Sequence, residues 1–332
     1  MIKSPQFYLM GLLLILVSGC QQTSPVGEPK SLFGFFDREK LVDREYNTPP
    51  STNSQCFSKS STPEQRTQST VFMLAAGANT GKLTKTSSDL ENFSQAMQGY
   101  FKIPQSQICQ LPNVFKAELE TALQSLNALM ASHDLVIIYF SGHGTFIEDN
   151  NGDEADRWDE ILVTYDSQCK KKVKDDKVKD DDGLRDDYFV KLVNNLPTDR
   201  VLTVMDTCFS SGMVLGSSLP NPLLANARSK ILVKGECGTQ APSLQSDKKN
   251  LIKNEVGNLD SLKGLLLAAA DEKQNAFEIE KGGLFTVKFI EQLRQYADLK
   301  KAFEQTKKQV WEITEKSKSP QEPQYKGKWE IL

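Results

Sequence analysis

The chain has 332 residues, of which 39% are hydrophobic and 25% are charged, a composition typical of globular proteins. This composition excludes a collagenous or wholly disordered chain, and a single apolar run excludes a membrane protein with several spans. The formal net charge of −3 lacks the basic excess of a nucleic-acid-binding surface, so we expect no nucleic-acid partner. At about 150 residues per domain, the length predicts one large domain or two small ones.

The apolar run lies at the start of the chain, where Lys3 precedes an apolar stretch over residues 7–17. A secretory signal typically has a basic residue, then a short apolar stretch, then small residues before the cleavage site. The ending Leu16-Val-Ser-Gly-Cys20 resembles the lipobox of bacterial lipoproteins. This resemblance implies a signal peptide over 1–19 and a membrane anchor through lipid on Cys20. By resemblance to proteobacterial lipoproteins, Gln21 in place of Asp favours the outer membrane for the exported protein. An ordinary signal peptide or an N-terminal anchor helix is the alternative.

Residues 20–66 are rich in Ser, Thr, Pro and Gln and predict an N-terminal tether, followed by one domain over 67–332. In chain order, the first part of the domain predicts a buried strand over 71–76, a helix over 88–100 that opens with the capping box Ser88-Asp-Leu-Glu91, a short strand over 107–111, an amphipathic helix over 114–132 and a strand over 135–140.

The second part predicts a strand over 161–165, a solvated charged loop over 170–187, a helix over 188–195, a strand over 201–205, a long loop over 214–260, a strand over 265–270, helices over 284–297 and 299–316, and an edge strand near 327–331. Strands that alternate with helices predict an α/β fold, in which a mostly parallel central sheet is covered by helices on both faces.

Two of the loops that follow strands carry chemically active side chains. The strand over 135–140 leads into Ser141-Gly-His143-Gly144, and the strand over 201–205 leads into Asp206-Thr-Cys208. Neighbouring strands lie about 4.8 Å apart, and ligands of such sheets bind at the carboxyl ends of the strands. A thiol and an imidazole at adjacent strand ends suit nucleophilic catalysis, in which the histidine takes and then returns a proton. Either residue alone is more often structural, but the pair predicts catalysis.

The motifs around these residues resemble those of the caspase/metacaspase family of cysteine peptidases. The resemblance covers residues 69–332 and rests on Phe140-Ser-Gly-His143-Gly144, Asp206-Thr-Cys208-Phe-Ser and Gly282-Gly-Leu-Phe285-Thr286. It implies a caspase-like three-layer sandwich with a large-subunit-like part over 69–215, a linker over 216–260 and a small-subunit-like part over 261–332. It also implies that Cys208 is the nucleophile and His143 the general base and acid, with the backbone N–H groups of Gly144 and Cys208 as the oxyanion hole. Substrates would then be proteins or peptides, and no cofactor would be required.

The resemblance to metacaspases further implies an acidic pocket for the residue before the cleaved bond. Asp206 stands two residues before the nucleophile, and Asp89 stands on the first helix. Two carboxylates suit an Arg or Lys side chain through charge-assisted hydrogen bonds. Asp89 could instead be only a partner of the helix dipole. In an enzyme with this specificity, linker residues such as Arg228, Lys230 and Lys234 could be self-cleavage sites, or they could form a plain basic exposed linker.

Calcium-dependent metacaspases place metal ligands at positions that resemble Asp166, Asp186 and Asp187, so calcium activation is a hypothesis, with a solvated acidic loop as the alternative. The family's further Asp is replaced by Leu215. The family's Cys-x-x-Asp is here Thr86-Ser-Ser-Asp89, and its Cys-x-Ser-Gly is lengthened to Cys208-Phe-Ser-Ser-Gly212.

Export would place the remaining cysteines in an oxidising compartment. Apart from Cys20 and Cys208, four cysteines remain, and they could form two disulfides in three connectivities or stay partly free: Cys56, Cys109, Cys169 and Cys237. A zinc site is poorly supported, because the sequence has two histidines and no Cys-x-x-Cys.

Two rival functions fit the same residues. The lengthened turn after Cys208 suits an inactive caspase-like module that binds a partner at the cell envelope. Acyl-enzyme chemistry also suits another cysteine hydrolase or a transpeptidase that acts on peptidoglycan or cell-surface proteins. The sequence leaves the natural substrate and the oligomeric state open.

Overall fold

The computed structural model describes residues 56–57, 63, 66–148, 158–165, 183–208, 221–232, 258–271, 274–317 and 319–332. The chain divides into two units, 1–42 and 43–332, and all described residues belong to the second. The predicted tether and signal peptide, including Cys20, lie almost entirely outside the described residues.

A six-stranded sheet forms the centre of the domain, with the strand order β12-β9-β7-β3-β1-β2. Five strands run parallel, and β12 pairs antiparallel with β9 at one edge. Their bounds are β1 (Val71–Gly77), β2 (Ile108–Pro112), β3 (Leu135–Ser141), β7 (Val201–Asp206), β9 (Leu265–Ala268) and β12 (Gln324–Gly327). The predicted α/β fold with a mostly parallel sheet is therefore confirmed.

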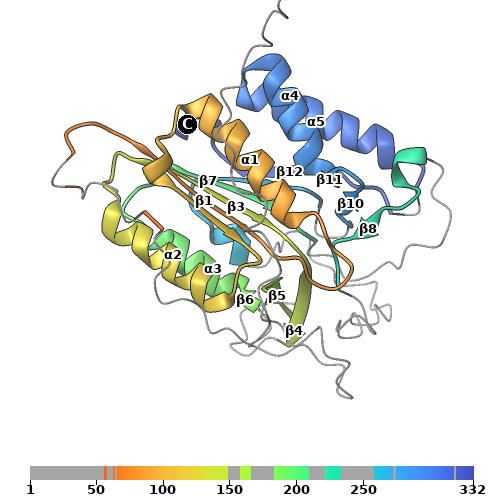
Figure 1. Cartoon of the computed structure of the whole chain (residues 1–332), viewed down its shortest axis with the longest axis horizontal. Coiled ribbons are helices and arrows are strands. Elements are labelled where there is room, and N and C mark those ends of the chain that lie inside the picture. Colours follow the sequence, from red (N-terminus) through yellow and green to blue (C-terminus); the bar gives the residue numbers. More distant parts are fainter. Residues whose placement is uncertain are drawn as a thin grey trace, which may run out of the picture. The chain divides into compact units, whose positions relative to one another are not determined.

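Helices cover both faces of this sheet (Figure 1). One face carries α1 (Thr86–Phe101), α4 (Leu284–Tyr296) and α5 (Leu299–Thr314), and the other carries α2 (Lys116–Leu129) and α3 (Asp186–Asn194). Successive strand residues point to opposite faces, so in β1 Phe72 and Leu74 join the core under α2 and α3, while Met73 and Ala75 join the core under α1 and α4. Because the sheet has a core on each face, side chains on both faces of a strand are buried, and the strand is a continuous apolar run in the sequence.

Two small three-stranded sheets extend from the central one. The first contains β4 (Gly144–Glu148), β5 (Trp158–Val163) and β6 (Gly183–Arg185). The second contains β8 (Arg228–Ser229), β10 (Phe277–Ile279) and β11 (Gly282–Gly283). Strands β4, β6, β8, β10 and β11 were not predicted. Four of them have only two or three residues, too few for a periodic pattern, and β4 follows directly on the loop that carries His143. In particular, β8 lies inside the stretch that the sequence predicts as a long loop.

Several boundaries differ from the predicted ones. The capping-box prediction at Ser88 is wrong, because α1 begins two residues earlier, at Thr86. Distant side chains satisfy the start of this helix instead: the side-chain oxygen of Asn79 accepts a hydrogen bond from the Thr86 N–H at 3.0 Å. The C-terminal edge strand ends at Gly327 rather than near residue 331, and a 3-10 helix over Trp329–Ile331 follows it.

A disulfide joins Cys56 to Cys109, which lies in β2. Among the described cysteines Cys208 is free, whereas Cys169 and Cys237 lie outside the described residues. No helix in the described part of the chain has the length and apolarity needed to cross a membrane.

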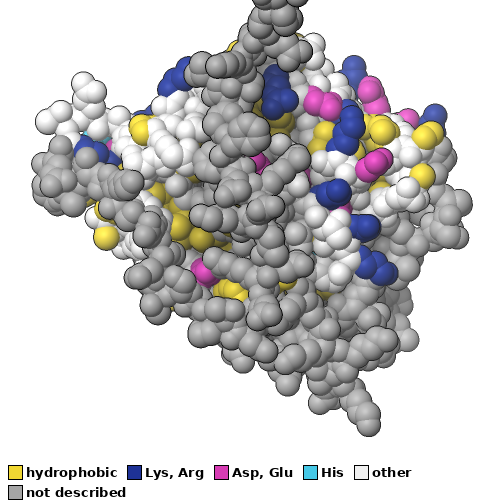
Figure 2. All heavy atoms as spheres, in the orientation of Figure 1, with side chains coloured by type: hydrophobic (Ala, Val, Ile, Leu, Met, Phe, Trp, Pro, Cys, Tyr) yellow, Lys and Arg dark blue, Asp and Glu magenta, His cyan; other side chains and the backbone are white. Residues whose placement is uncertain are grey.

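On the face shown in Figure 2, basic and acidic side chains are interspersed over the region of α4 and α5. Lys288 pairs with Glu291 on α4, and Lys308 pairs with Glu312 on α5. This part of the surface therefore follows the near balance of charge in the sequence.

Candidate active site

The ends of β3 and β7 bring the His143 and Cys208 loops together. The two strands are neighbours in parallel register, with Ser141 opposite Asp206. His143 and Cys208 each follow their strand end by two residues, so both lie at the same edge of the sheet. A Cβ on Gly144 would overlap the carbonyl oxygen of Cys208, which shows how closely the loops pack and why a glycine stands there.

The Cys208 thiol is fully buried and bonded to the backbone of Ala276. Its Sγ accepts a hydrogen bond from the Ala276 N–H at 2.8 Å and donates to the Ala276 carbonyl at 3.3 Å. Burial raises the pKa of this thiol from 9.0 to about 12, against smaller opposing effects of the Ala276 N–H and the Lys230 charge. The thiol is therefore neutral at pH 7.

The His143 imidazole is also fully buried, and neither ring nitrogen has a hydrogen-bond partner among the described residues. Its backbone carbonyl accepts a hydrogen bond from the Val163 N–H at 3.0 Å, which fixes the loop against β5. Burial lowers the pKa of this imidazole from 6.5 to about 4, so it too is neutral at pH 7.

The chain itself covers both residues, through the segment over 228–232. The N–H of Lys230 donates to the Ala276 carbonyl at 2.9 Å, and the carbonyl of Lys230 accepts from the Gly144 N–H at 2.9 Å. The Leu232 N–H donates to the Gly144 carbonyl at 3.2 Å. Before this point, β8 pairs antiparallel with β10, with Ser229 opposite Phe277. Both backbone polar groups of Lys230 are therefore bound by the residues that surround Cys208.

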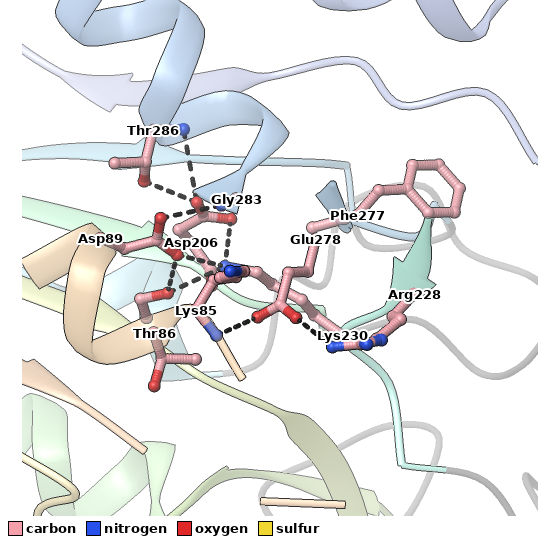
Figure 3. A network of polar contacts seen from close by, with 12 residues as sticks. Lys85, Thr86, Asp89, Asp206, Arg228, Lys230, Phe277, Glu278, Gly283 and Thr286 are labelled. Atoms are coloured by element: carbon pink, nitrogen blue, oxygen red, sulfur yellow. Dashed lines mark hydrogen bonds and ion pairs between the residues drawn. The ribbon is translucent and has the colours of Figure 1, made fainter. Parts of the chain in front are cut away.

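The side chain of Lys230 enters the predicted acidic pocket (Figure 3). Its ammonium lies 2.9 Å from Asp206 Oδ1 and 3.6 Å from Asp89 Oδ2, and it donates to Ser141 Oγ at 2.9 Å. Lys230 is fully buried, and burial alone would lower the pKa of its ammonium, but the Asp206 and Asp89 carboxylates outweigh this and raise it. Burial raises the pKa of Asp89 to about 6. The predicted exposed linker is wrong for Lys230, because two buried carboxylates attract its charge.

The motif from Gly282 to Thr286 holds the two carboxylates in place. The Gly283 N–H donates to Asp89 Oδ1 at 2.8 Å, and the Thr286 hydroxyl donates to Asp206 Oδ2 at 2.6 Å. A Cβ on Gly283 would overlap Asp206 Oδ2, so only glycine fits at this position. The sequence indicated this motif through family resemblance alone, and the structure gives its physical role as a wall of the acidic pocket.

A family model described as the caspase domain matches residues 72–328. The chain belongs to the caspase-domain family. Members of this family are cysteine peptidases, and the caspase-like α/β fold accounts for the sheet and its two helical layers. No curated protein matches the chain in sequence.

Solved structures resemble the caspase domain at low sequence identity. Protein GSU0716 from Geobacter sulfurreducens has a TM-score of 0.54 and 19% identity, with 79% of this chain and 96% of that chain covered. Caspase-1 from Spodoptera frugiperda has a TM-score of 0.45 and 12% identity, with 78% of this chain and 86% of that chain covered. The structural similarity to GSU0716 supports the fold and carries no statement about function.

The described residues of the caspase domain do not make a calcium site by themselves. Asp186 and Asp187 begin α3, and Asp166 lies outside the described residues. Next to them, Arg185 forms an ion pair with Asp159. Where the chain is described, no group of three or more His, Cys, Asp or Glu side chains could hold a metal ion. Calcium binds six to eight oxygens, so a site at Asp186 and Asp187 would need further ligands besides these two carboxylates.

Three residues of the site escaped the sequence analysis or received no role there. Ala276 acts through its backbone, which leaves no signature in the residue type. Glu278, which forms an ion pair with Arg228 at 3.0 Å, is a single acidic residue in a three-residue strand. Lys230 was named as a possible self-cleavage site or exposed linker residue but not as part of the pocket, and its position there depends on contacts across the fold.

Proposed function

We propose that this caspase domain is a cysteine endopeptidase that cleaves after Arg or Lys, with Cys208 as nucleophile and His143 as general base and acid. The observation that carries the proposal is the binding of Lys230. Its ammonium lies between Asp89 and Asp206, while its carbonyl accepts the Gly144 N–H. A substrate with a basic residue before the cleaved bond, the P1 residue, would be bound by the same groups.

In the proposed reaction, His143 takes the thiol proton and the Cys208 sulfur attacks the carbonyl carbon of the P1 residue. The Gly144 N–H and, by family resemblance, the Cys208 N–H stabilise the oxyanion, and one such donor is typically worth about 3–4 kcal/mol of the barrier. His143 then protonates the leaving amine, and the C–N bond breaks to leave a thioester on Cys208. Water, deprotonated by His143, hydrolyses this thioester and regenerates the thiol.

The covered site explains why this chemistry would start slowly. Moving a proton from a thiol with a pKa of about 12 to an imidazole with a pKa of about 4 costs on the order of 10 kcal/mol. Departure of the segment over 228–232 would admit water and bring both pKa values back toward their ordinary range. We therefore assign a latent state to the covered form, and we assign first cleavage to the Lys230–Ile231 bond rather than to Arg228 or Lys234.

The test is a peptidase assay on the full-length chain with fluorogenic peptides that carry Lys, Arg or Asp at P1. We expect hydrolysis after Lys and Arg but not after Asp, loss of hydrolysis in Cys208→Ala, and a new N-terminus at Ile231 in the wild type. Lys300→Ala, on an exposed position of α5, is the matched surface control. Hydrolysis after Asp, or equal hydrolysis by Cys208→Ala, would overturn the proposal.

One observation favours the rival binding module. Cys208 and His143 are both fully buried and electrically neutral, which also fits a domain whose site is permanently closed. In that case no peptide would be cleaved, and Cys208 would stay unreactive even after the pocket is emptied by Lys230→Ala.

We also propose that the mature chain is exported and held at the outer membrane by lipid on Cys20. The disulfide between Cys56 and Cys109 supports export, because disulfides persist in oxidising compartments. Cys20→Ser should release the protein from the membrane fraction. Calcium activation through Asp166, Asp186 and Asp187 stays a proposal, which a chelator in the peptidase assay tests.

A further inference from the structure

The covering segment makes a second charged contact with the site, two residues before Lys230. Strand β8 pairs with β10 so that Arg228 lies opposite Glu278. The Arg228 guanidinium donates to Glu278 Oε1 at 3.0 Å and to the Thr84 hydroxyl at 2.7 Å. Figure 3 shows the Arg228 guanidinium joined to Glu278 and the Lys230 ammonium joined to the pocket that contains Asp89 and Asp206. The segment therefore presents one basic side chain to each of two acidic subsites.

Glu278 is held by hydrogen bonds from outside the covering segment and is not merely a partner of Arg228. Its side chain is 1% exposed, and it accepts hydrogen bonds from the Thr84 N–H at 3.0 Å and the Lys85 N–H at 2.9 Å. These backbone donors precede α1 and lie outside the covering segment, so the carboxylate keeps both hydrogen bonds when that segment leaves. The side chain of Arg228, by contrast, is 42% exposed, so it lies at the rim of the site.

We infer that Glu278 is a second specificity determinant, which selects Arg or Lys at P3, the residue two positions before the P1 residue. This inference rests on the proposed peptidase function, since it assumes that substrates follow the path of the segment over 228–232. Ser229 lies between the two basic residues, and its hydroxyl accepts a hydrogen bond from the Ile231 N–H at 3.2 Å, a contact within the segment itself. The recognised sequence would then be basic, unrestricted, basic, with cleavage after the second basic residue.

The first experiment compares three fluorogenic peptides with Lys at P1, Ser at P2 and either Arg, Ala or Glu at P3. For the full-length wild type we expect kcat/KM to be about tenfold higher with Arg than with Ala, because a partly exposed ion pair with a fixed carboxylate is of this order. In Glu278→Gln the ratio of Arg to Ala should fall to about one. In Glu278→Arg the preference should reverse in favour of the peptide with Glu at P3.

Ratios between peptides within one variant cancel any general effect of the substitution on folding or on the P1 pocket. A merely structural Glu278 would lower all three rates together and leave the wild-type ratio in the variants, which would overturn the inference. Cleavage after Lys with no preference at P3 in the wild type would also overturn it while leaving the proposed function intact.

A second experiment does not depend on peptidase activity. It measures the rate of alkylation of Cys208 by iodoacetamide in the full-length wild type, Arg228→Ala, Glu278→Gln and the double variant. If Glu278 binds Arg228 in the covered form, either single substitution should speed alkylation several-fold, and the double variant should be no faster than the faster single one. Independent, multiplicative effects would overturn the inference. Coupling without any peptide hydrolysis would show the Arg228–Glu278 contact in the covered form, but it would reject the peptidase and with it the selection at P3.

Discussion

Replacing Lys230 by Ala should open the site, and the size of the effect follows from the contacts of its ammonium. Lys230 is wholly buried between Asp206, at 2.9 Å, and Asp89, at 3.6 Å. Removing one partner of a buried ion pair costs about 3–5 kcal/mol, because the remaining charges are left without a counter-charge in the interior. This cost applies to the covered form, whereas water reaches the carboxylates in the open form. A cost of about 3 kcal/mol, the lower end of this range, shifts the equilibrium between the covered and open forms on the order of 100-fold toward the open form.

Alkylation of Cys208 by iodoacetamide at pH 7.5, followed by mass spectrometry of the peptide, measures the open fraction. In the covered form the pKa of about 12, against an ordinary 9.0, makes the thiolate about 1000-fold scarcer, so the reaction proceeds through the open form. We therefore expect alkylation on the order of 100-fold faster in Lys230→Ala than in the wild type. Lys230→Arg, which keeps a cation in the pocket, should stay close to the wild type.

General destabilisation needs its own control, because global unfolding also exposes Cys208. Leu123→Ala removes a buried side chain of α2 on the opposite face of the sheet and should cost about 2–5 kcal/mol of unfolding free energy. Alkylation of Leu123→Ala should stay near the wild-type rate if opening is local. The reasoning is refuted if the thiol of the uncleaved wild-type chain reacts as fast as an exposed cysteine, or if Lys230→Ala changes the rate no more than Leu123→Ala does.

Two further predictions concern stability. The Cys56–Cys109 disulfide spans 53 residues of sequence, so its loss in Cys56→Ala should lower the free energy of unfolding by about 4 kcal/mol in urea titrations; an unchanged midpoint would contradict this. The pKa of His143 is lowered from 6.5 to about 4 in the folded chain, so the unfolded chain binds more protons between pH 6.5 and pH 4. As the pH falls through this range, His143 therefore lowers the free energy of unfolding by about 3 kcal/mol. Asp89, with its pKa raised to about 6, binds its proton earlier in the folded state and acts in the opposite direction. His143→Gln should therefore become more stable between pH 6.5 and 4 relative to the wild type, and parallel pH profiles would reject the assignment.

Local pattern in the sequence determined the elements of the fold. Continuous apolar runs predicted the strands β1, β3, β7 and β9, because a strand covered on both faces must be apolar at every position. The same pattern placed His143 and Cys208 just beyond strand ends, and family resemblance named Asp89 and Asp206 as an acidic pair. Residue type, period and chain order are all that these inferences require.

Only the tertiary structure decided what fills and completes the site. Lys230 reads as one more basic residue in a linker, and its role comes from Asp206, 24 residues away in sequence, and from Ser141, 89 residues away. Glu278 and the backbone of Ala276 likewise gain their roles through the pairing of β8 with β10 and through contacts with Cys208. The sequence does not show which group a charged side chain will contact, and a backbone N–H donor leaves no trace in the residue type. Both acquire meaning only when the fold brings distant segments within hydrogen-bond distance of one another.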